Sequence, residues 1–165
     1  MTQSRNYVAR GVAHVTLPPV AEPLAVSFVL LPKFTMLAFS AAIEPLRIAN
    51  QLTGQILFRW QVLSEDGGPV ACSNGVPVMA AGAWGGTQPQ GMVLVCSGVE
   101  PEGKASAALA DWLRGLWRRG RVVGGLCTGA YTLARAGILK GRRFTLHWEN
   151  IEGFSETYPD LHPLR

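Results

Sequence analysis

The residue with the strongest chemical character in this sequence is Cys127, which lies in a Gly-x-Cys-x-Gly turn. The apolar run 122–126 precedes it, and small residues with helical spacing follow it. This order is typical of a nucleophile elbow, whose central residue occupies a strained turn and needs small neighbours, here Gly125 and Gly129. The start of the following helix would stabilise a thiolate. The pattern therefore indicates a reactive cysteine, with a small buried side chain that only packs as the alternative.

Other candidate residues follow other apolar runs. Gly98 and Thr128 could present backbone N–H groups to a carboxylate or another anion. His147 and Trp148 follow a run near the C-terminus, with Glu149 beside them. A tryptophan face with a nearby carboxylate suits a cationic nitrogen, so these residues are predicted to line a ligand pocket. The alternatives are that Trp148 is an ordinary core or interface aromatic and that His147 is a structural histidine.

The elements that would position these residues alternate between strands and helices. Strands are expected at 24–31, 58–65, 91–98, 121–127 and 142–148, and helices at 35–54, 104–120, 128–139 and 149–159. Residues 68–80 are expected to form a hairpin with Asn74 and Gly75 in its turn. This alternation predicts an α/β fold with a doubly wound, mainly parallel sheet and helices on both faces.

Such a sheet places functional groups in the crevice at the carboxyl ends of its strands. The residues expected there are 32–33, 65–66, 97–98, 127–128 and 147–148.

Composition sets the broad class of the protein. The chain has 165 residues, 48% of them hydrophobic and 16% charged, which is enough for one packed domain. Its net charge of +4 comes from local basic clusters that we expect to be solvated, so nucleic-acid binding by this segment is not predicted. Three widely spaced cysteines argue against a disulfide framework and a zinc site, and favour a cytoplasmic location. Pro32 and Lys33 interrupt the longest apolar run, which argues against a membrane span.

The sequence resembles the class I glutamine amidotransferase-like (PfpI-like) domain at the N-terminus of many bacterial AraC-family (GlxA-type) transcriptional regulators. The resemblance runs from Leu24 to the end of the chain and is carried by residues 28–50, 93–101 and, above all, 122–161. It implies a flavodoxin-like fold, a small-molecule effector, no cofactor and no metal, and a homodimer. It also implies that DNA is bound through a separate C-terminal helix-turn-helix domain that this chain does not contain. Residues 1–22 are then an irregular extension, and 23–165 a ligand-sensing domain that lacks its last strand and helix.

Two departures from the enzymes of that superfamily shape the functional prediction. Those enzymes carry a histidine directly after the cysteine, where this chain has Thr128, and a glutamate from the first helix at a position matching Ala41. Glu44 is the nearest carboxylate in that segment and could reach the rim of the pocket. No catalytic residue is therefore expected. Cys127 remains the candidate nucleophile, and without catalysis it is predicted to line the ligand pocket with Gly98 and Thr128.

The prediction is a non-catalytic sensing domain for a small amine such as a betaine, a carnitine relative or arginine, as the resemblance implies. The alternatives are a PfpI-like cysteine hydrolase, amidase or glyoxalase-type enzyme that uses Cys127, and a redox sensor that uses the same thiol.

Overall fold

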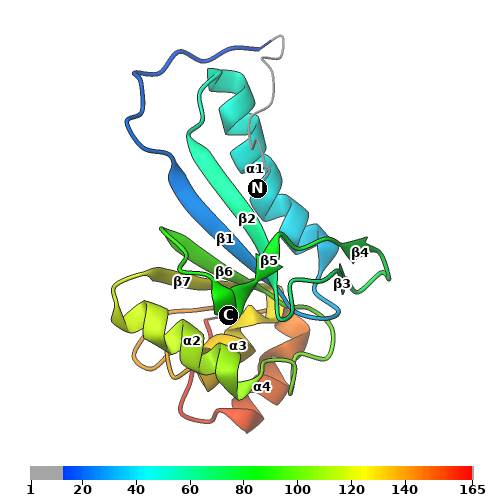
Figure 1. Cartoon of the computed structure of the whole chain (residues 1–165). Helices are drawn as coiled ribbons and strands as arrows, with labels where there is room; N and C mark the ends of the chain where they lie inside the picture. Colours follow the sequence, from blue (N-terminus) through cyan, green and yellow to red (C-terminus); the bar gives the residue numbers. More distant parts are fainter. Residues whose placement is uncertain (1–12, 165) are drawn as a thin grey trace.

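A five-stranded parallel sheet forms the centre of the molecule in the computed structural model, which describes residues 13–164 (Figure 1). In spatial order its strands are β5 (Gly82–Ala83), β2 (Phe58–Ser64), β1 (Leu24–Leu30), β6 (Met92–Cys96) and β7 (Val122–Leu126). From β1 the chain builds one side of the sheet with β2 and β5, and then crosses to the other side of β1 for β6 and β7. In sheets of this kind, ligands usually bind at the carboxyl ends of the strands where the strand order reverses, which here is between β1 and β6.

Alternate side chains of β1 face two separate hydrophobic cores. Val26 and Phe28 belong to the core that includes residues of α1 (Met36–Thr53). Val29 belongs to the other core, which includes residues of α2 (Ala107–Arg118). Successive strand residues point to opposite faces, so a strand buried on both faces has a continuous apolar sequence. The predicted α/β sheet with helices on both faces is confirmed.

Helix α1 is fixed to the start of β2 by a buried asparagine. The Asn50 side chain donates to the Phe58 carbonyl at 2.8 Å and accepts from the Leu57 amide at 2.8 Å. Gly54 ends the helix in the left-handed conformation, at φ 63°. The predicted stop at this glycine is confirmed, because a residue without a Cβ adopts this conformation at low cost.

The predicted hairpin is present, with β3 (Val70–Ala71) antiparallel to β4 (Pro77–Val78). Gly75 has φ 86°, and the Asn74 side chain accepts from the Val76 amide at 3.0 Å. The hairpin is followed by β5, which the sequence did not predict because its two residues carry no periodicity.

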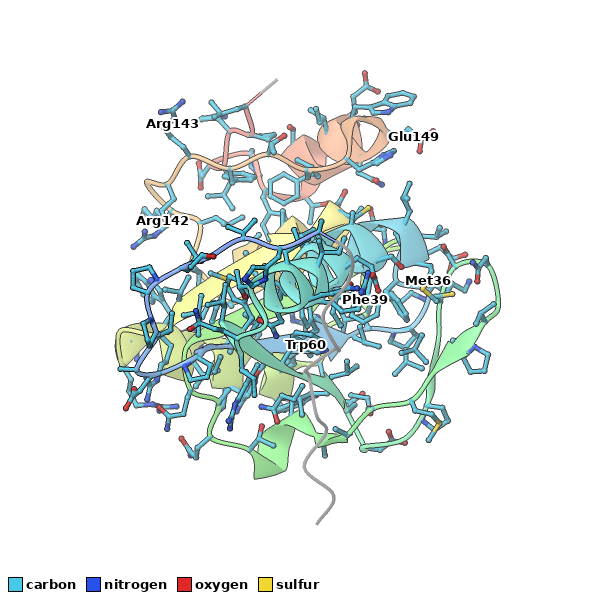
Figure 2. The ribbon with its side chains drawn as sticks, turned by 90° about the horizontal axis from the view of Figure 1, so that it is seen from above. Met36, Phe39, Trp60, Arg142, Arg143 and Glu149 are labelled. Carbon is cyan, nitrogen blue, oxygen red and sulfur yellow. The ribbon has the colours of Figure 1, made fainter. Side chains whose placement is uncertain are left out.

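The strand predicted at residues 142–148 is wrong. This segment contains no strand and is followed by a 3₁₀ turn, Trp148–Asn150, and by α4 (Ile151–Thr157). Figure 2 shows the segment extended along one side of the molecule, from Arg142 and Arg143 to Glu149. Phe144 packs on the Phe154 ring at 5.5 Å, and Leu146 is buried in the same core. The alternation that suggested a strand therefore comes from an extended chain packed on helices.

The helix predicted at residues 128–139 is shorter in the structure. A 3₁₀ turn, Cys127–Gly129, leads into α3 (Ala130–Arg135). Gly137 has φ 70° and the Ile138 amide donates to the Leu133 carbonyl at 3.0 Å, which is typical of a helix end.

Residues 13–23 precede the sheet without forming a helix or strand, and they lie along the end of α1. The Val15 amide donates to the Leu52 carbonyl at 2.8 Å, and the Gln55 side chain donates to the Leu17 carbonyl at 3.0 Å. Residues 1–12 of the predicted extension lie outside the described residues. Among the described helices, none is both long and apolar enough to cross a membrane.

Candidate functional site

The loops after β1 and β6, where the sequence predicts the crevice, are held together by backbone hydrogen bonds. The Thr35 amide donates to the Ser97 carbonyl at 3.2 Å, and the Val99 amide donates to the Lys33 carbonyl at 3.1 Å. Phe34 and Gly98 form a β-bridge between the same two loops. The loop after β1 and the loop after β6 therefore form one continuous surface beside Cys127.

Cys127 occupies the strained turn that the sequence predicted. Its φ of 55° lies in the left-handed region, which a residue with a side chain seldom adopts. A Cβ on Gly125 would lie 2.8 Å from the carbonyl carbon of Gly129, and a Cβ on Gly129 would lie 2.6 Å from the Val95 carbonyl oxygen. Both glycines are needed because backbone fills the space that a methyl group would occupy. The elbow geometry is thus that of a displayed nucleophile.

The contacts of Cys127 differ from those of an activated nucleophile. The Thr35 hydroxyl lies 3.4 Å from the Cys127 sulfur and donates to it. The side chain of Thr128, the residue after the cysteine, is buried, and its hydroxyl donates to the Gly98 carbonyl at 2.7 Å. A threonine hydroxyl is not a general base at neutral pH, so neither contact would remove the thiol proton.

Thr35 was missed by the sequence reasoning. It lies immediately before α1, two residues beyond the strand-end pair that was expected in the crevice. Its position at the start of a predicted helix, close to a strand end, was the signal that could have placed it near Cys127.

Gly98 approaches the loop after β1 too closely for any side chain. A Cβ on Gly98 would lie 2.4 Å from the Lys33 carbonyl oxygen and 2.7 Å from the Thr35 amide nitrogen. The structure thus brings three of the predicted ligand residues together, namely Gly98, Cys127 and Thr128. Their role in binding an anion stays a prediction.

The other predicted ligand residues lie elsewhere. The His147 ring stacks on Trp148 with centroids 5.8 Å apart, and its Nδ1 lies 3.6 Å from the Glu149 carboxylate. Trp148 is 73% exposed. Glu44 pairs with Arg47 at 2.6 Å. It lies about 12 Å along α1 from the end beside Cys127, from the rise of 1.5 Å per residue. The binding roles of these four predicted residues stay predictions.

A cavity of about 330 Å³ lies at the carboxyl ends of β1 and β2. Its wall includes two pairs that were expected at strand ends, residues 32–33 and 65–66, together with Trp84 from the turn after β5 and Lys104 from the loop before α2. None of the predicted ligand residues belongs to its lining.

Three titratable groups in this region have altered pKa values. The Lys33 ammonium hydrogen bonds to Glu100 at 2.6 Å and, with Lys104, holds the pKa of Glu100 below its ordinary value. The Gly68 amide donates to Asp66 at 2.8 Å and lowers the pKa of that carboxyl. Burial raises the pKa of the Cys96 thiol well above its ordinary value. Glu100 and Asp66 are therefore ionised at neutral pH, and Cys96 stays protonated.

Among residues 13–164, no three histidine, cysteine or acidic side chains come together in a way that could hold a metal ion. The three cysteines are free thiols, with Cys72 and Cys96 buried and Cys127 partly exposed.

The family follows from comparison with known proteins. A family model described as the DJ-1/PfpI family matches residues 28–158, which includes both loops at the crevice and the elbow. The chain belongs to the DJ-1/PfpI family. The resemblance expected from residues 28–50 and 122–161 is confirmed.

The curated relatives of this DJ-1/PfpI chain include several transcriptional regulators. The HTH-type transcriptional regulator CdhR of Pseudomonas aeruginosa is 48% identical over 134 residues, which is 81% of this chain and 40% of the relative. The HTH-type transcriptional regulator GlxA of Rhizobium meliloti is 39% identical over 139 residues, which is 84% of this chain and 43% of the relative. The chain thus spans about two fifths of the length of these relatives.

Solved structures agree with this assignment. An AraC family transcriptional regulator from Pseudomonas putida has a TM-score of 0.77 at 29% identity, covering 86% of this chain and 76% of that one. Drosophila melanogaster DJ-1beta has a TM-score of 0.71 at 17% identity, covering 87% of this chain and 74% of that one, a likeness of fold alone. This DJ-1/PfpI domain is therefore of the kind found in AraC-type regulators.

Proposed function

We propose that this DJ-1/PfpI domain is the non-catalytic sensing domain of an AraC-type transcriptional regulator. The observation that carries the proposal is the environment of Cys127, which has the Thr35 hydroxyl at its sulfur and Thr128 bonded to the Gly98 carbonyl. Within residues 13–164 the hydrogen bond found at the Cys127 sulfur comes from a hydroxyl, and a cysteine without an acid–base partner lacks the usual means of activation. The similarity to CdhR and GlxA supports the same conclusion.

The effector proposed is a small amine such as a betaine, a carnitine relative or arginine, as the family resemblance implies. Binding of such an effector would shift the equilibrium between two arrangements of the regulator, most simply within a homodimer. DNA would be bound by a separate helix-turn-helix domain.

Thermal denaturation of the purified protein with glycine betaine, L-carnitine and L-arginine tests this proposal. An effector at about 100 times its Kd stabilises the folded state by about 2.7 kcal/mol, which corresponds to a rise in Tm of roughly 5–10 °C. Cys127→Ser should still show a rise in Tm, because sensing requires no reaction at the thiol. The small-amine proposal would be refuted if a folded sample gave no rise in Tm with any of these compounds.

A cysteine-dependent enzyme is the second candidate, and the strained turn at Cys127 favours it. It predicts that iodoacetamide alkylates Cys127 at about pH 6 faster than it alkylates free cysteine, because activated cysteines are already thiolates there. It also predicts an amidase or glyoxalase activity that Cys127→Ser abolishes. If Cys127 were alkylated at the rate of free cysteine and no such activity were found, the enzyme hypothesis would be refuted and the sensing domain would remain.

A further inference from the structure

The cavity at the carboxyl ends of β1 and β2 combines a charged rim with an apolar interior. Its buried wall includes Leu31, Val70, Trp84 and Leu109. Its volume of about 330 Å³ falls within the range of small-molecule sites, about 300–1,000 Å³. The cavity is therefore large enough for a compact metabolite with an apolar body.

The rim beside β2 is negatively charged. Glu65 and Asp66 follow the last residue of β2 and belong to the cavity wall. The Asp66 carboxylate is oriented by the Gly68 amide at 2.8 Å and by the Ser64 hydroxyl at 3.3 Å. Asp66 is exposed, and the cavity wall also includes the buried Trp84. A carboxylate together with an aromatic ring is a combination that can bind a cationic nitrogen.

The cavity wall also includes two positively charged residues. Lys33 and Lys104 belong to the cavity wall, and their ammonium groups lie 2.6 Å and 3.5 Å from the same Glu100 oxygen. A single carboxylate shared by two ammonium groups leaves one positive charge uncompensated, which can attract a ligand carboxylate.

The backbone under this ion pair is strained on both sides. Lys33 has φ 63° and Glu100 has φ 53°, and both values lie in the left-handed region. The Lys33 backbone is held there by its amide, which donates to the Ala71 carbonyl at 2.9 Å, and by its carbonyl, which accepts from the Val99 amide at 3.1 Å. Side chains in rarely populated backbone conformations cluster at ligand sites, where the strain fixes their direction.

We propose that this cavity binds a small zwitterion, with its cationic nitrogen between Asp66 and Trp84 and its carboxylate at Lys33 and Lys104. This inference rests on the proposed sensing function and assigns it a location different from the surface at Cys127. The loop after β1 connects the two places, because Lys33 lines the cavity and Thr35 contacts the Cys127 sulfur.

Isothermal titration calorimetry of the purified protein tests the location. Glycine betaine, L-carnitine and L-arginine are titrated first. The tightest of them is then compared with an analogue that lacks the carboxylate: choline for glycine betaine, (2-hydroxypropyl)trimethylammonium for L-carnitine, and agmatine for L-arginine. Asp66→Asn keeps the acceptor for the Gly68 amide and removes the charge. Asp66→Asn should raise the Kd of the zwitterion and the Kd of its analogue by about fivefold each, which corresponds to about 1 kcal/mol of binding free energy.

Lys104→Gln should raise the Kd of the zwitterion by about fivefold and leave the Kd of the analogue unchanged, because the analogue has no carboxylate to contact Lys104. A general loss of structure would not separate the two ligands in this way. Asp111→Asn and Lys140→Gln are the matched controls. These controls make the same charge changes at residues outside the cavity wall. Asp111 pairs with Arg114 at 2.6 Å. Both control variants should bind the zwitterion and its analogue with the same Kd as the unmodified protein.

Three outcomes are distinguishable. The crossed pattern of Asp66→Asn and Lys104→Gln supports the cavity as the site. Zwitterion binding that neither variant weakens overturns this location and leaves the sensing function in place. Failure of the folded protein to bind any of the three zwitterions overturns both the location and the small-amine sensing proposal.

Discussion

Replacing Gly98 by alanine should destabilise the protein through the contact between the loops after β1 and β6. The added Cβ would lie 2.4 Å from the Lys33 carbonyl oxygen and 2.7 Å from the Thr35 amide nitrogen. Real Cβ atoms do not approach backbone this closely, and no side chain can rotate away to make room, so the loops must separate. Forcing extra volume into a packed site typically costs about 1–3 kcal/mol.

Separation also endangers the two backbone hydrogen bonds that flank Gly98. These are the bond from the Val99 amide to the Lys33 carbonyl at 3.1 Å and the bond from the Thr35 amide to the Ser97 carbonyl at 3.2 Å. Each such bond contributes about 0.5–1.5 kcal/mol. The expected decrease in the free energy of unfolding for Gly98→Ala is therefore about 2–6 kcal/mol if both bonds are lost.

Urea denaturation followed by circular dichroism measures this change, with Gly82→Ala as the matched control. A Cβ on Gly82 meets no atom within 4 Å, so the control should lie within about 0.5 kcal/mol of the unmodified protein. If Gly98→Ala unfolded at the same urea concentration as Gly82→Ala, with an unchanged m-value, the reasoning about the contact between the loops would be refuted.

Three further predictions concern the same region. Thr128→Val should lower the free energy of unfolding by about 1–2 kcal/mol and Thr128→Ser by less, because only valine leaves the Gly98 carbonyl without its donor; urea denaturation of the pair compares them. Burial raises the pKa of the Cys96 thiol above its ordinary value of 9.0. As pH rises above 9.0 only the unfolded state loses the thiol proton, so the free energy of unfolding should fall. Urea denaturation at alkaline pH should show that Cys96→Ala removes this part of the decrease. Lys33 holds the pKa of Glu100 below its ordinary value of 4.5. Their ion pair should therefore stabilise the folded protein at pH values above 4.5, and this stabilisation should be lost as pH falls through the folded-state pKa. An NMR titration of the Glu100 carboxyl should show a higher midpoint in Lys33→Met, and an unchanged midpoint would contradict the pairing.

The sequence by itself determined four strands of the sheet, the helices α1 and α2 on its two faces and the strained turn at Cys127. The apolar runs of β1 and β6 predict buried strands, because burial on both faces removes the polar alternation, whereas Phe58 and Trp60 alternate with Arg59 as in a half-buried strand. Gly125 and Gly129 predict the turn at Cys127, because only glycine leaves room beside a residue held in such a conformation. These features depend on neighbours in the sequence, so local periodicity and local steric demand were sufficient.

Only the tertiary structure decided what surrounds Cys127 and where a ligand can be enclosed. Thr35 contacts Cys127 across 92 positions of sequence, and the cavity joins residues from β1, β2, the turn after β5 and the start of α2. The segment 142–148 alternates as a strand would, yet its apolar residues pack on a helix core. Alternation in a sequence indicates which side chains are buried but not which element covers them. The covering element is decided only when distant segments pack together.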